Sequence, residues 1–271
     1  MAITSFKPAT WEQALLLKFR GISVAELVTT APMSVEGAKA IFNSLTGGTI
    51  KDYTGTIAWD EATTSPIELL FNIKKYFALS MDDCDKVQAN AEVLMTLAGE
   101  KALDIKEVID TDLMVEMAKC ATAANKQQIG TTAAKIPVKL ASAAYDSVVD
   151  LGTILSGKKV PATGRFVLAK SEFINQMAKD HRFVTNFNVL PNGIVQGATI
   201  NGMQVVQCEE VPANTAICCH KSAFGFAKQI DKVEALRLQS GFADGVRGLV
   251  QYGRINLRSE AVSTLIYDLT V

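Results

Sequence analysis

Apolar and polar residues alternate along residues 67–79, in the clearest two-residue period of the chain. Successive side chains of a β-strand point to opposite faces of a sheet, so this period predicts one strand with a single buried face. Glu68, Asn72, Lys74 and Tyr76 would lie on its polar face. The apolar face would consist of Ile67, Leu69, Phe71, Ile73, Phe77 and Leu79.

After residue 80 the apolar residues recur at spacings of three and four, and no proline interrupts the pattern up to Cys120. This spacing predicts a helix of roughly 35 residues and about 50 Å, with residues 80–83 as its N-terminal cap. One apolar stripe on so long a helix indicates that it lies across a sheet rather than inside a bundle. The stripe contains Val87, Ala91, Leu94, Ala98, Ala102, Ile105, Ile109, Leu113 and Met117.

The segment before this strand is rich in turn-forming residues. Residues 11–27 have helical spacing, which Pro32 and Gly37 interrupt. Residues 46–66 then contain three glycines and a proline among mostly polar residues. Four apolar residues in this segment suit strands, so we expect an extended, two-stranded excursion from the body. They are Ile50, Tyr53, Ile57 and Trp59.

The second half of the chain predicts a mixture of helices and strands without a βαβ rhythm, which is typical of an α+β fold. Helices are expected at residues 140–155, ending near Gly157, and at residues 171–179, capped by Ser171. A buried strand is expected at residues 164–169. Further strands are expected at residues 197–207, 215–219, 233–239, 246–258 and 262–269.

Composition narrows the functional classes. With 48% hydrophobic and 20% charged residues, the 271-residue chain is expected to fold around a real core. Its 27 basic and 28 acidic residues give no overall attraction to nucleic acid. No run approaches the ~18–20 apolar residues of a membrane span, and the N-terminus has no signal-peptide pattern. Five unpatterned cysteines indicate a reducing compartment, so we expect a soluble chain made in a cytoplasm.

No catalytic, cofactor-binding or metal site emerges from the motifs. The nucleophile, zinc and nucleotide signatures are absent, and there are only two histidines. Residues 218–220 read Cys-Cys-His, but neighbours on a strand point to opposite faces and cannot close one metal site. The acidic residues 82–85 are explained by helix capping, and the glycines at 245, 248 and 253 by strand bends. The arginines at 165, 237, 247, 254 and 258 could pair within the subunit, pair across an interface or remain surface charges.

Four stretches in order along nearly the whole chain carry a resemblance to a known family. Residues 5–11 contain Phe-x-Pro-x-x-Trp, and residues 50–53 with 74–89 resemble an extended loop running into a long helix. Residues 160–167 contain Val-Pro-x-x-x-Arg, and residues 246–253 end on Tyr-Gly. In these stretches the chain resembles the major capsid proteins of tailed bacteriophages with the Hong Kong 97-type fold.

The resemblance implies an α+β fold with an N-terminal arm, an extended β-hairpin loop, a long spine helix with a peripheral sheet, and a mixed axial domain. The implied ranges are 1–32 for the arm, 33–67 for the loop region, 68–135 with 230–256 for the peripheral domain, and 136–229 with 257–271 for the axial domain. The family's covalent cross-link cannot be carried over, so Lys51 and Asn256 receive no role.

The resemblance also implies the function. The chain would be a structural protein without enzymatic activity, cofactor, membrane or small-molecule substrate, made in the cytoplasm of a host bacterium and located in the virion capsid. Its partners would be further copies of itself in hexamers and pentamers, a portal, and packaged DNA bound without sequence specificity. The sequence has no long coiled N-terminal segment of the kind fused as a scaffold in some relatives, so a separate scaffolding protein is implied.

Assembly contacts are expected at Ile50, Asp52, Tyr53, Ile57 and Trp59, because an excursion that buries little surface by itself must lie on a neighbouring subunit. Two alternatives stay open. An encapsulin-like nanocompartment shell would share the fold and enclose a cargo enzyme, although the Phe-x-Pro-x-x-Trp opening favours the phage protein. A soluble enzyme with an unrecognised site is the third possibility.

Overall fold

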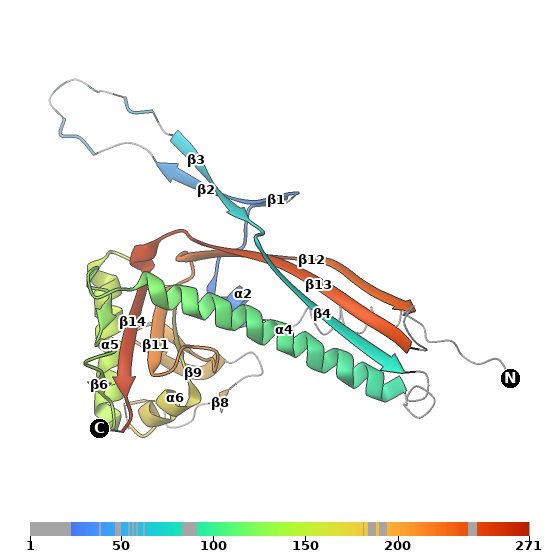
Figure 1. Cartoon of the computed structure of the whole chain (residues 1–271). Coiled ribbons are helices and arrows are strands. Elements are labelled where there is room, and N and C mark those ends of the chain that lie inside the picture. Colours follow the sequence, from blue (N-terminus) through green and yellow to red (C-terminus); the bar gives the residue numbers. More distant parts are fainter. Residues whose placement is uncertain are drawn as a thin grey trace.

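The computed structural model describes residues 23–37, 39–46, 50–53, 55, 57, 59–61, 63–82, 91–180, 182–183, 188–189, 194–237 and 243–270. Over these residues the chain is a mixed α+β protein, which confirms the expected fold class. Figure 1 shows a body at the lower left, a long sheet with a long helix extending to the right, and a hairpin excursion to the upper left. Expectations for residues 5–11, for most of the helical spacing at 11–27 and for residues 83–90 lie outside the described residues.

The body is built on a mixed sheet with the strand order β5-β14-β11-β7-β10-β9-β8, and β6 also pairs with β14. Two helices, α5 (Ala141–Gly157) and α6 (Ser171–Met177), belong to the same unit. The strands are β5 (Gln128–Ile129), β6 (Ile136–Pro137), β7 (Arg165–Ala169), β8 (Asn188–Val189), β9 (Ile194–Ile200), β10 (Met203–Gln207), β11 (Thr215–His220) and β14 (Val262–Asp268).

Strand β7 is buried on both faces, which explains the continuous apolar run at its residues 166–169. Val167 and Ala169 pack in one cluster with Leu151 and other residues of α5. Phe166 and Leu168 point to the opposite cluster. The body sheet is therefore the middle layer between two hydrophobic cores, as the predicted buried strand at 164–169 requires.

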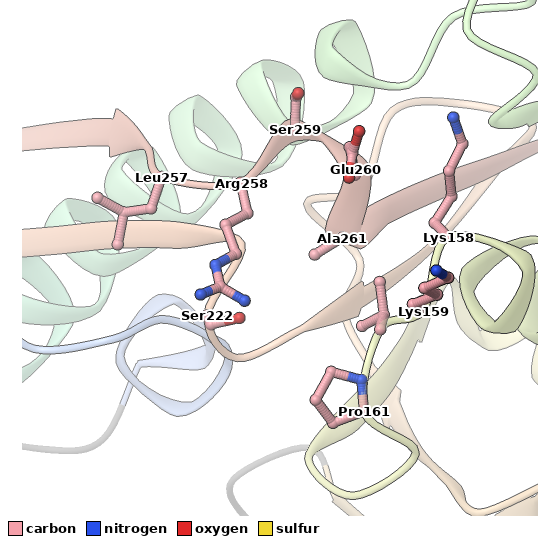
Figure 2. Close-up of a pocket in the computed structure, with 10 residues that line it drawn as sticks. Lys158, Lys159, Pro161, Ser222, Leu257, Arg258, Ser259, Glu260 and Ala261 are labelled. Atoms are coloured by element: carbon pink, nitrogen blue, oxygen red, sulfur yellow. The ribbon is translucent and has the colours of Figure 1, made fainter. Parts of the chain in front are cut away.

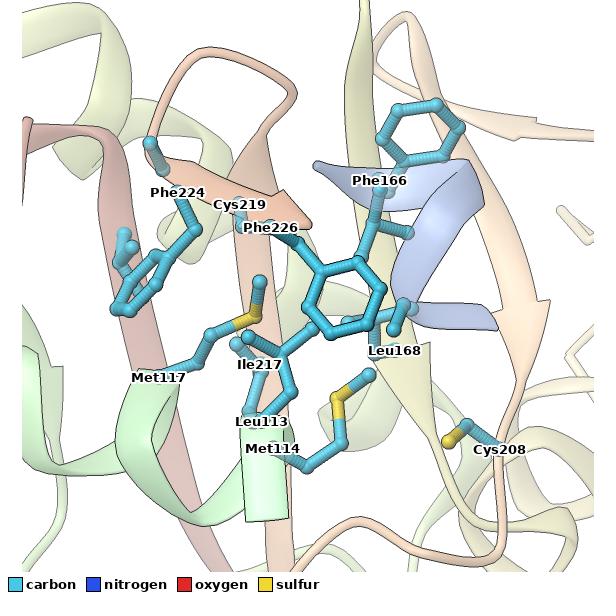
Figure 3. Packing of buried hydrophobic residues seen from close by; sticks show 14 of the residues in the cluster. Leu113, Met114, Met117, Phe166, Leu168, Cys208, Ile217, Cys219, Phe224 and Phe226 are labelled. Carbon is cyan, nitrogen blue, oxygen red and sulfur yellow. The ribbon is translucent and has the colours of Figure 1, made fainter. Parts of the chain in front are cut away.

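The second core lies between this sheet and the long helix α4 (Ala91–Cys120). Figure 3 shows Leu113, Met114 and Met117 of α4 directed toward Ile217 of the sheet and Phe226 of the long hairpin. These three α4 side chains are at most 1% exposed. The C-terminal half of the predicted apolar stripe is thus confirmed, whereas the side chains of residues 91–99 are not among those described.

Helix α4 continues beyond the body along a three-stranded antiparallel sheet (Figure 1). The helix has 30 described residues and is about 45 Å long at 1.5 Å per residue. Tyr252 donates a hydrogen bond to Asp112 of α4, and Arg254 forms ion pairs with Asp112 and Glu116 at 2.5 and 2.9 Å. The sheet has the order β12-β13-β4 and consists of β4 (Ile73–Asp82), β12 (Phe224–Arg237) and β13 (Ala243–Asn256).

The excursion is a separate three-stranded antiparallel sheet, and a short helix leads into it. Helix α2 is capped by Ser23, whose hydroxyl accepts a hydrogen bond from the amide of Glu26. The paired strands β2 and β3 run from Lys39 opposite Leu70 to Thr46 opposite Thr63. The elements are α2 (Val24–Val28), β1 (Ser34–Glu36), β2 (Lys39–Thr46) and β3 (Thr63–Leu70); the 3-10 helix η1 (Ser259–Ala261) lies later, before β14.

The prediction of one strand over residues 67–79 was wrong, although its two faces were right. The amide of Asn72 donates to the carbonyl of Leu70 in a tight turn, so β3 ends and β4 begins in a different sheet. Leu69 and Phe71 are buried while Leu70 and Tyr76 are exposed, so the alternation persists across the break. Consequently one amphipathic segment connects the excursion to the long sheet.

Four other boundaries differ from the prediction. Residues 80–82 continue β4, so they do not cap the long helix. Residues 197–207 form the hairpin β9–β10, because Asn201 and Gly202 have φ of 50° and 76° and make a two-residue turn. Lys170 rather than Ser171 precedes α6. The long hairpin starts at Phe224, nine residues before the predicted strand, because its first residues complete the α4 core.

Among the described helices, none is long and apolar enough to cross a membrane.

Candidate assembly surfaces

The tip of the excursion carries the predicted assembly residues. The relative exposures of Ile50, Tyr53, Ile57 and Trp59 are 105%, 77%, 69% and 89%, and Asp52 is also exposed. Their described positions lie in no strand; the paired strands end at Thr46 and Thr63, before and after them. The structure thus has the expected excursion, but the prediction that residues 46–66 form its two strands was wrong: the paired strands β2 and β3 flank this segment, and β1 adds a third strand to their sheet. Contact of these side chains with a neighbour stays a prediction.

The tip is predominantly acidic. Residues 50–61 contain one lysine and three carboxylates. Lys51, which has no role by resemblance, forms an ion pair with Asp60 at 2.5 Å across the two sides of the tip. Within the described part of the chain, Asp52 and Glu61 form no ion pair. The tip therefore combines large exposed apolar side chains with excess negative charge.

Two glycines of the long hairpin fix the base of the excursion. A Cβ added at Gly225 would lie 2.5 Å from the ring of Phe42, and one at Gly253 would lie 2.4 Å from both Leu69 and the carbonyl of Leu70. Phe42 and Leu69 are only 5% and 1% exposed. The absent side chains thus create two slots in which the excursion is seated. Gly253, predicted to be a strand bend, instead permits this close approach.

A cleft of about 400 Å³ lies beside this base (Figure 2). Arg258 and Leu257 form one side, and Lys158, Lys159 and Pro161 form the opposite side. The remaining lining residues are Val160, Ser222, Ser259, Glu260 and Ala261. The cleft therefore has three cationic side chains and a single carboxylate.

Buried polar side chains fix both walls of the cleft. Arg165, only 3% exposed, donates to the carbonyls of Val160 and Pro161 at 2.6 and 2.8 Å. Gln127, 2% exposed, donates to the carbonyls of Ser259 and Val262 at 2.7 and 2.8 Å. The walls are thus anchored to the body independently of any bound group.

The charge of Arg165 has no carboxylate partner among the described residues. Its remaining hydrogen bonds go to the carbonyl of Gly152 and the hydroxyl of Ser156, both at 3.1 Å. Burial lowers the pKa of the nearby His220, and the positive charges of Arg165 and Arg258 act in the same direction. His220 also interacts through its two ring nitrogens with Ser222 and the carbonyl of Thr163.

The sequence left open whether the arginines pair within the subunit, and Arg254 does so. It forms ion pairs with Asp112 and Glu116 inside the subunit, and the hydrogen bond from Arg254 lowers the pKa of Glu116. These pairs fasten the long sheet to α4. Arg258, in contrast, faces the cleft and has no carboxylate partner among the described residues.

The cysteine–histidine run has the structural role expected from strand geometry. Cys218 and Cys219 are fully buried in different cores on the two faces of β11. Burial raises the pKa of Cys218 to about 12, which keeps its thiol protonated and unreactive. Asn256 donates to the sulfur of Cys120. Over the described residues, no three histidine, cysteine or acidic side chains gather as metal ligands.

Asp110 is a structural residue that sequence reasoning missed. Its carboxylate, on α4, accepts hydrogen bonds from the amides of Val24 and Ala25 at 3.3 and 3.0 Å, which fixes the start of α2. Burial raises the pKa of Asp110 to about 6, against the opposing effect of these hydrogen bonds. An acidic residue beside the apolar stripe was the available signal, but its partners are about 85 residues away in sequence.

Comparison with solved structures finds similar folds over nearly the whole chain. The structure of Mycobacterium phage Che8 matches with a TM-score of 0.61 and 21% identity, covering 98% of this chain and 94% of the other. The capsid structure of cyanophage P-SCSP1u matches with a TM-score of 0.66 and 12% identity, covering 99% and 91%. The chain has the fold of bacteriophage capsid proteins.

The capsid fold is also found in a particle from an archaeon. The virus-like particle from Pyrococcus furiosus matches with a TM-score of 0.56 and 12% identity, covering 95% of this chain and 98% of the other. No protein-family model matches the sequence, and no related sequence is found among curated proteins. The expected Hong Kong 97-type resemblance is thus confirmed at the level of the fold.

Proposed function

We propose that this chain is a major capsid protein, a structural subunit that assembles into the icosahedral head of a tailed phage. The observation that carries the proposal is the excursion tip, where four large apolar side chains are exposed on a projecting hairpin. Exposed apolar groups gathered in this way mark an interaction site. In a shell each tip would be buried on a neighbouring copy, and the capsid fold supplies the context for that contact.

The finer features follow the family resemblance and belong to the same proposal. The copies would form hexamers and pentamers, with a separate scaffolding protein and a portal as partners, and would enclose DNA without sequence specificity. The chain would act as a structural protein rather than an enzyme, would be made in the cytoplasm of the host bacterium and would end in the virion capsid. The division at residues 32, 67, 135, 229 and 256 into arm, loop, peripheral and axial parts remains a prediction.

An encapsulin-like compartment is the alternative, since a virus-like particle from an archaeon has the same fold. The two functions differ in what the shell encloses. Particles recovered from infected cells with packaged DNA would support the phage head. A cargo enzyme inside particles made by uninfected cells would support the compartment.

The direct test removes the tip while keeping the strands that carry it. Thr46 pairs with Thr63, so replacing residues 47–62 by Asn-Gly joins β2 to β3 through a two-residue turn. We expect a soluble, cooperatively folded monomer that forms no shells, as judged by circular dichroism melts and sedimentation on the same sample. Shells of normal size from this variant would contradict the proposal.

Point variants separate the apolar contacts from the loop itself. Truncation of a buried aromatic anchor often costs about 2 kcal/mol or more at an interface. Tyr53→Ala with Trp59→Ala should therefore raise the concentration needed for assembly, while the monomer melts as wild type does. Tyr53→Phe with Trp59→Phe is the matched control, because it retains most of the apolar area and should still assemble. Unimpaired assembly of the double alanine variant would contradict the role assigned to these side chains.

A further inference from the structure

The basic cleft beside the excursion base has no charge partner among the residues that the structure describes. Lys158, Lys159 and Arg258 form no ion pair with any described residue, although all three line one cavity (Figure 2). The single carboxylate on its lining, Glu260, offsets one of the three charges. An anionic group is therefore the ligand chemistry that the cleft favours.

The cleft is also built to keep its shape. Arg165 and Gln127 anchor its two walls from within the body, and the amides of Leu257 and Arg258 both donate to the carbonyl of Ala223. Arg165 adds a buried positive charge, so a bound anion would meet a fixed electrostatic field. Lys159 has a φ of 59°, a left-handed conformation that turns the chain after α5 into the wall.

The excursion tip is complementary to this cleft in charge and in apolar surface. Asp52 and Glu61 lie at the tip and have no ion pair among the described residues. Tyr53 and Trp59, exposed between them, match the apolar part of the lining, which contains Leu257 and Pro161 among other residues.

The tip cannot reach the cleft of its own subunit. Leu257 lines the cleft and also packs against the cluster that contains Phe42 and Leu69 at the base of the excursion. From the base pair Lys39–Leu70, the paired strands extend through seven residue steps, or about 24 Å, before the tip begins. A stiff antiparallel hairpin holds its tip away from its base, so the partner tip must come from another molecule.

We infer that the cleft formed by Lys158, Lys159 and Arg258 receives the acidic excursion tip of a second copy of this chain. The inference rests on the proposed shell function and deepens it by naming the receiving surface. Each copy then presents a tip at the far end of its excursion and a cleft beside the base of that excursion. This is a head-to-tail contact, which closes into rings when the rotation between copies permits.

Charge reversal tests the contact without altering the core. Lys158→Glu with Lys159→Glu should raise the threshold concentration for assembly about tenfold or more, and Asp52→Lys with Glu61→Lys should do the same. Lys126→Glu is the matched control: Lys126 is also an exposed lysine with a left-handed φ, 56°, and its reversal should leave assembly unchanged. Circular dichroism melts verify that each variant folds.

Mixing the two reversed proteins gives the decisive measurement. One protein has an acidic tip and an acidic cleft, and the other has a basic tip and a basic cleft. When the two alternate around a ring, every acidic tip meets a basic cleft and every basic tip meets an acidic cleft. Rings with an even number of subunits should therefore form from the mixture at concentrations where neither protein assembles alone. A chain carrying all four reversals should likewise recover assembly.

The outcomes separate the cleft from the shell function. If wild type and Lys126→Glu assemble and the variant with both cleft lysines reversed assembles equally well, the cleft inference is wrong and the shell function stands. If that variant assembles normally but loses binding to duplex DNA, the cleft serves phosphate groups instead and the inference is wrong. If wild type forms no shell or ring with or without a scaffold, both proposals fail.

Discussion

Gly225 offers a quantitative test of how the excursion is seated. In Gly225→Ala the new Cβ would lie 2.5 Å from the Phe42 Cζ and 2.9 Å from both Cε atoms, about 1 Å inside an ordinary contact. Overpacking of this kind costs about 1–3 kcal/mol, and alanine recovers about 0.5–1 kcal/mol by restricting the unfolded chain. The expected net loss of unfolding free energy is therefore about 1–2 kcal/mol.

This loss is measurable in the monomer. For a chain of this size, 1 kcal/mol shifts the melting temperature by about 2–4 °C, so Gly225→Ala should melt about 2–8 °C below wild type. The melts are followed by circular dichroism at a concentration where sedimentation gives monomer alone. Gly157→Ala is the control, because Gly157 ends α5 and a Cβ there meets nothing within 4 Å. It should melt within about 2 °C of wild type or slightly above.

A double-mutant cycle identifies the ring as the cause. Phe42→Ala removes a side chain that is only 5% exposed and should by itself cost about 3 kcal/mol or more. In that background the slot is empty, so Gly225→Ala should stabilise the chain by about 0.5–1 kcal/mol, and the cycle should give a coupling equal to the overpacking cost, about 1–3 kcal/mol. An equal cost of Gly225→Ala in both backgrounds would refute the proposed slot.

Three further measurements test the core, the buried carboxylate and the thiols. Ile109→Ala should cost about 2–4 kcal/mol in denaturant titrations because the side chain is 3% exposed, whereas Leu103→Ala, at a 56% exposed position of the same helix, should stay within about 0.5 kcal/mol. Since burial raises the pKa of Asp110 to about 6, the folded chain binds this proton more tightly than the unfolded chain. Its contribution to the free energy of unfolding should therefore fall by about 3 kcal/mol between pH ~3 and pH ~7. The pH-dependent melts of Asp110→Asn should lack that change, and an unchanged slope would contradict the buried position. At pH 8 a thiol reagent should label Cys218 only after unfolding and a reductant should leave the melting temperature unchanged; rapid labelling of the folded chain would contradict its burial.

The elements that were predicted best from the sequence are those whose buried side chains recur in a regular pattern along the chain. The stripe from Ile105 to Met117 follows one face of α4, and the apolar run at residues 166–169 of β7 reflects cores on both sides of that strand. The break at Asn72 could not be predicted, because buried and exposed residues continue to alternate across it. One strand and two consecutive strands therefore give the same hydrophobic pattern. The hairpin at Asn201-Gly202, in contrast, had a readable turn signal that the interpretation missed.

The cleft could not have been predicted from local patterns. Its lining comes from residues 158–161, 222 and 257–261, which are separated by up to about 100 residues and meet only through the pairing of strands in the folded chain. The lysines at 158 and 159 follow a helix, where basic residues are ordinary. The exposed tip was easier to predict, because its apolar residues stand in a segment too polar and too rich in turns to bury them.

The seating of the excursion on two glycine slots makes it a lever arm. Its paired strands place the tip about 24 Å from the base pair Lys39–Leu70, so a tilt of about 5° at that pair moves the tip by about 2 Å. A displacement of that size is enough to align or separate an ion pair. In the proposed contact between copies, the fit of Phe42 and Leu69 against Gly225 and Gly253 would thus set the angular tolerance from one copy to the next, and with it the curvature of the surface they build.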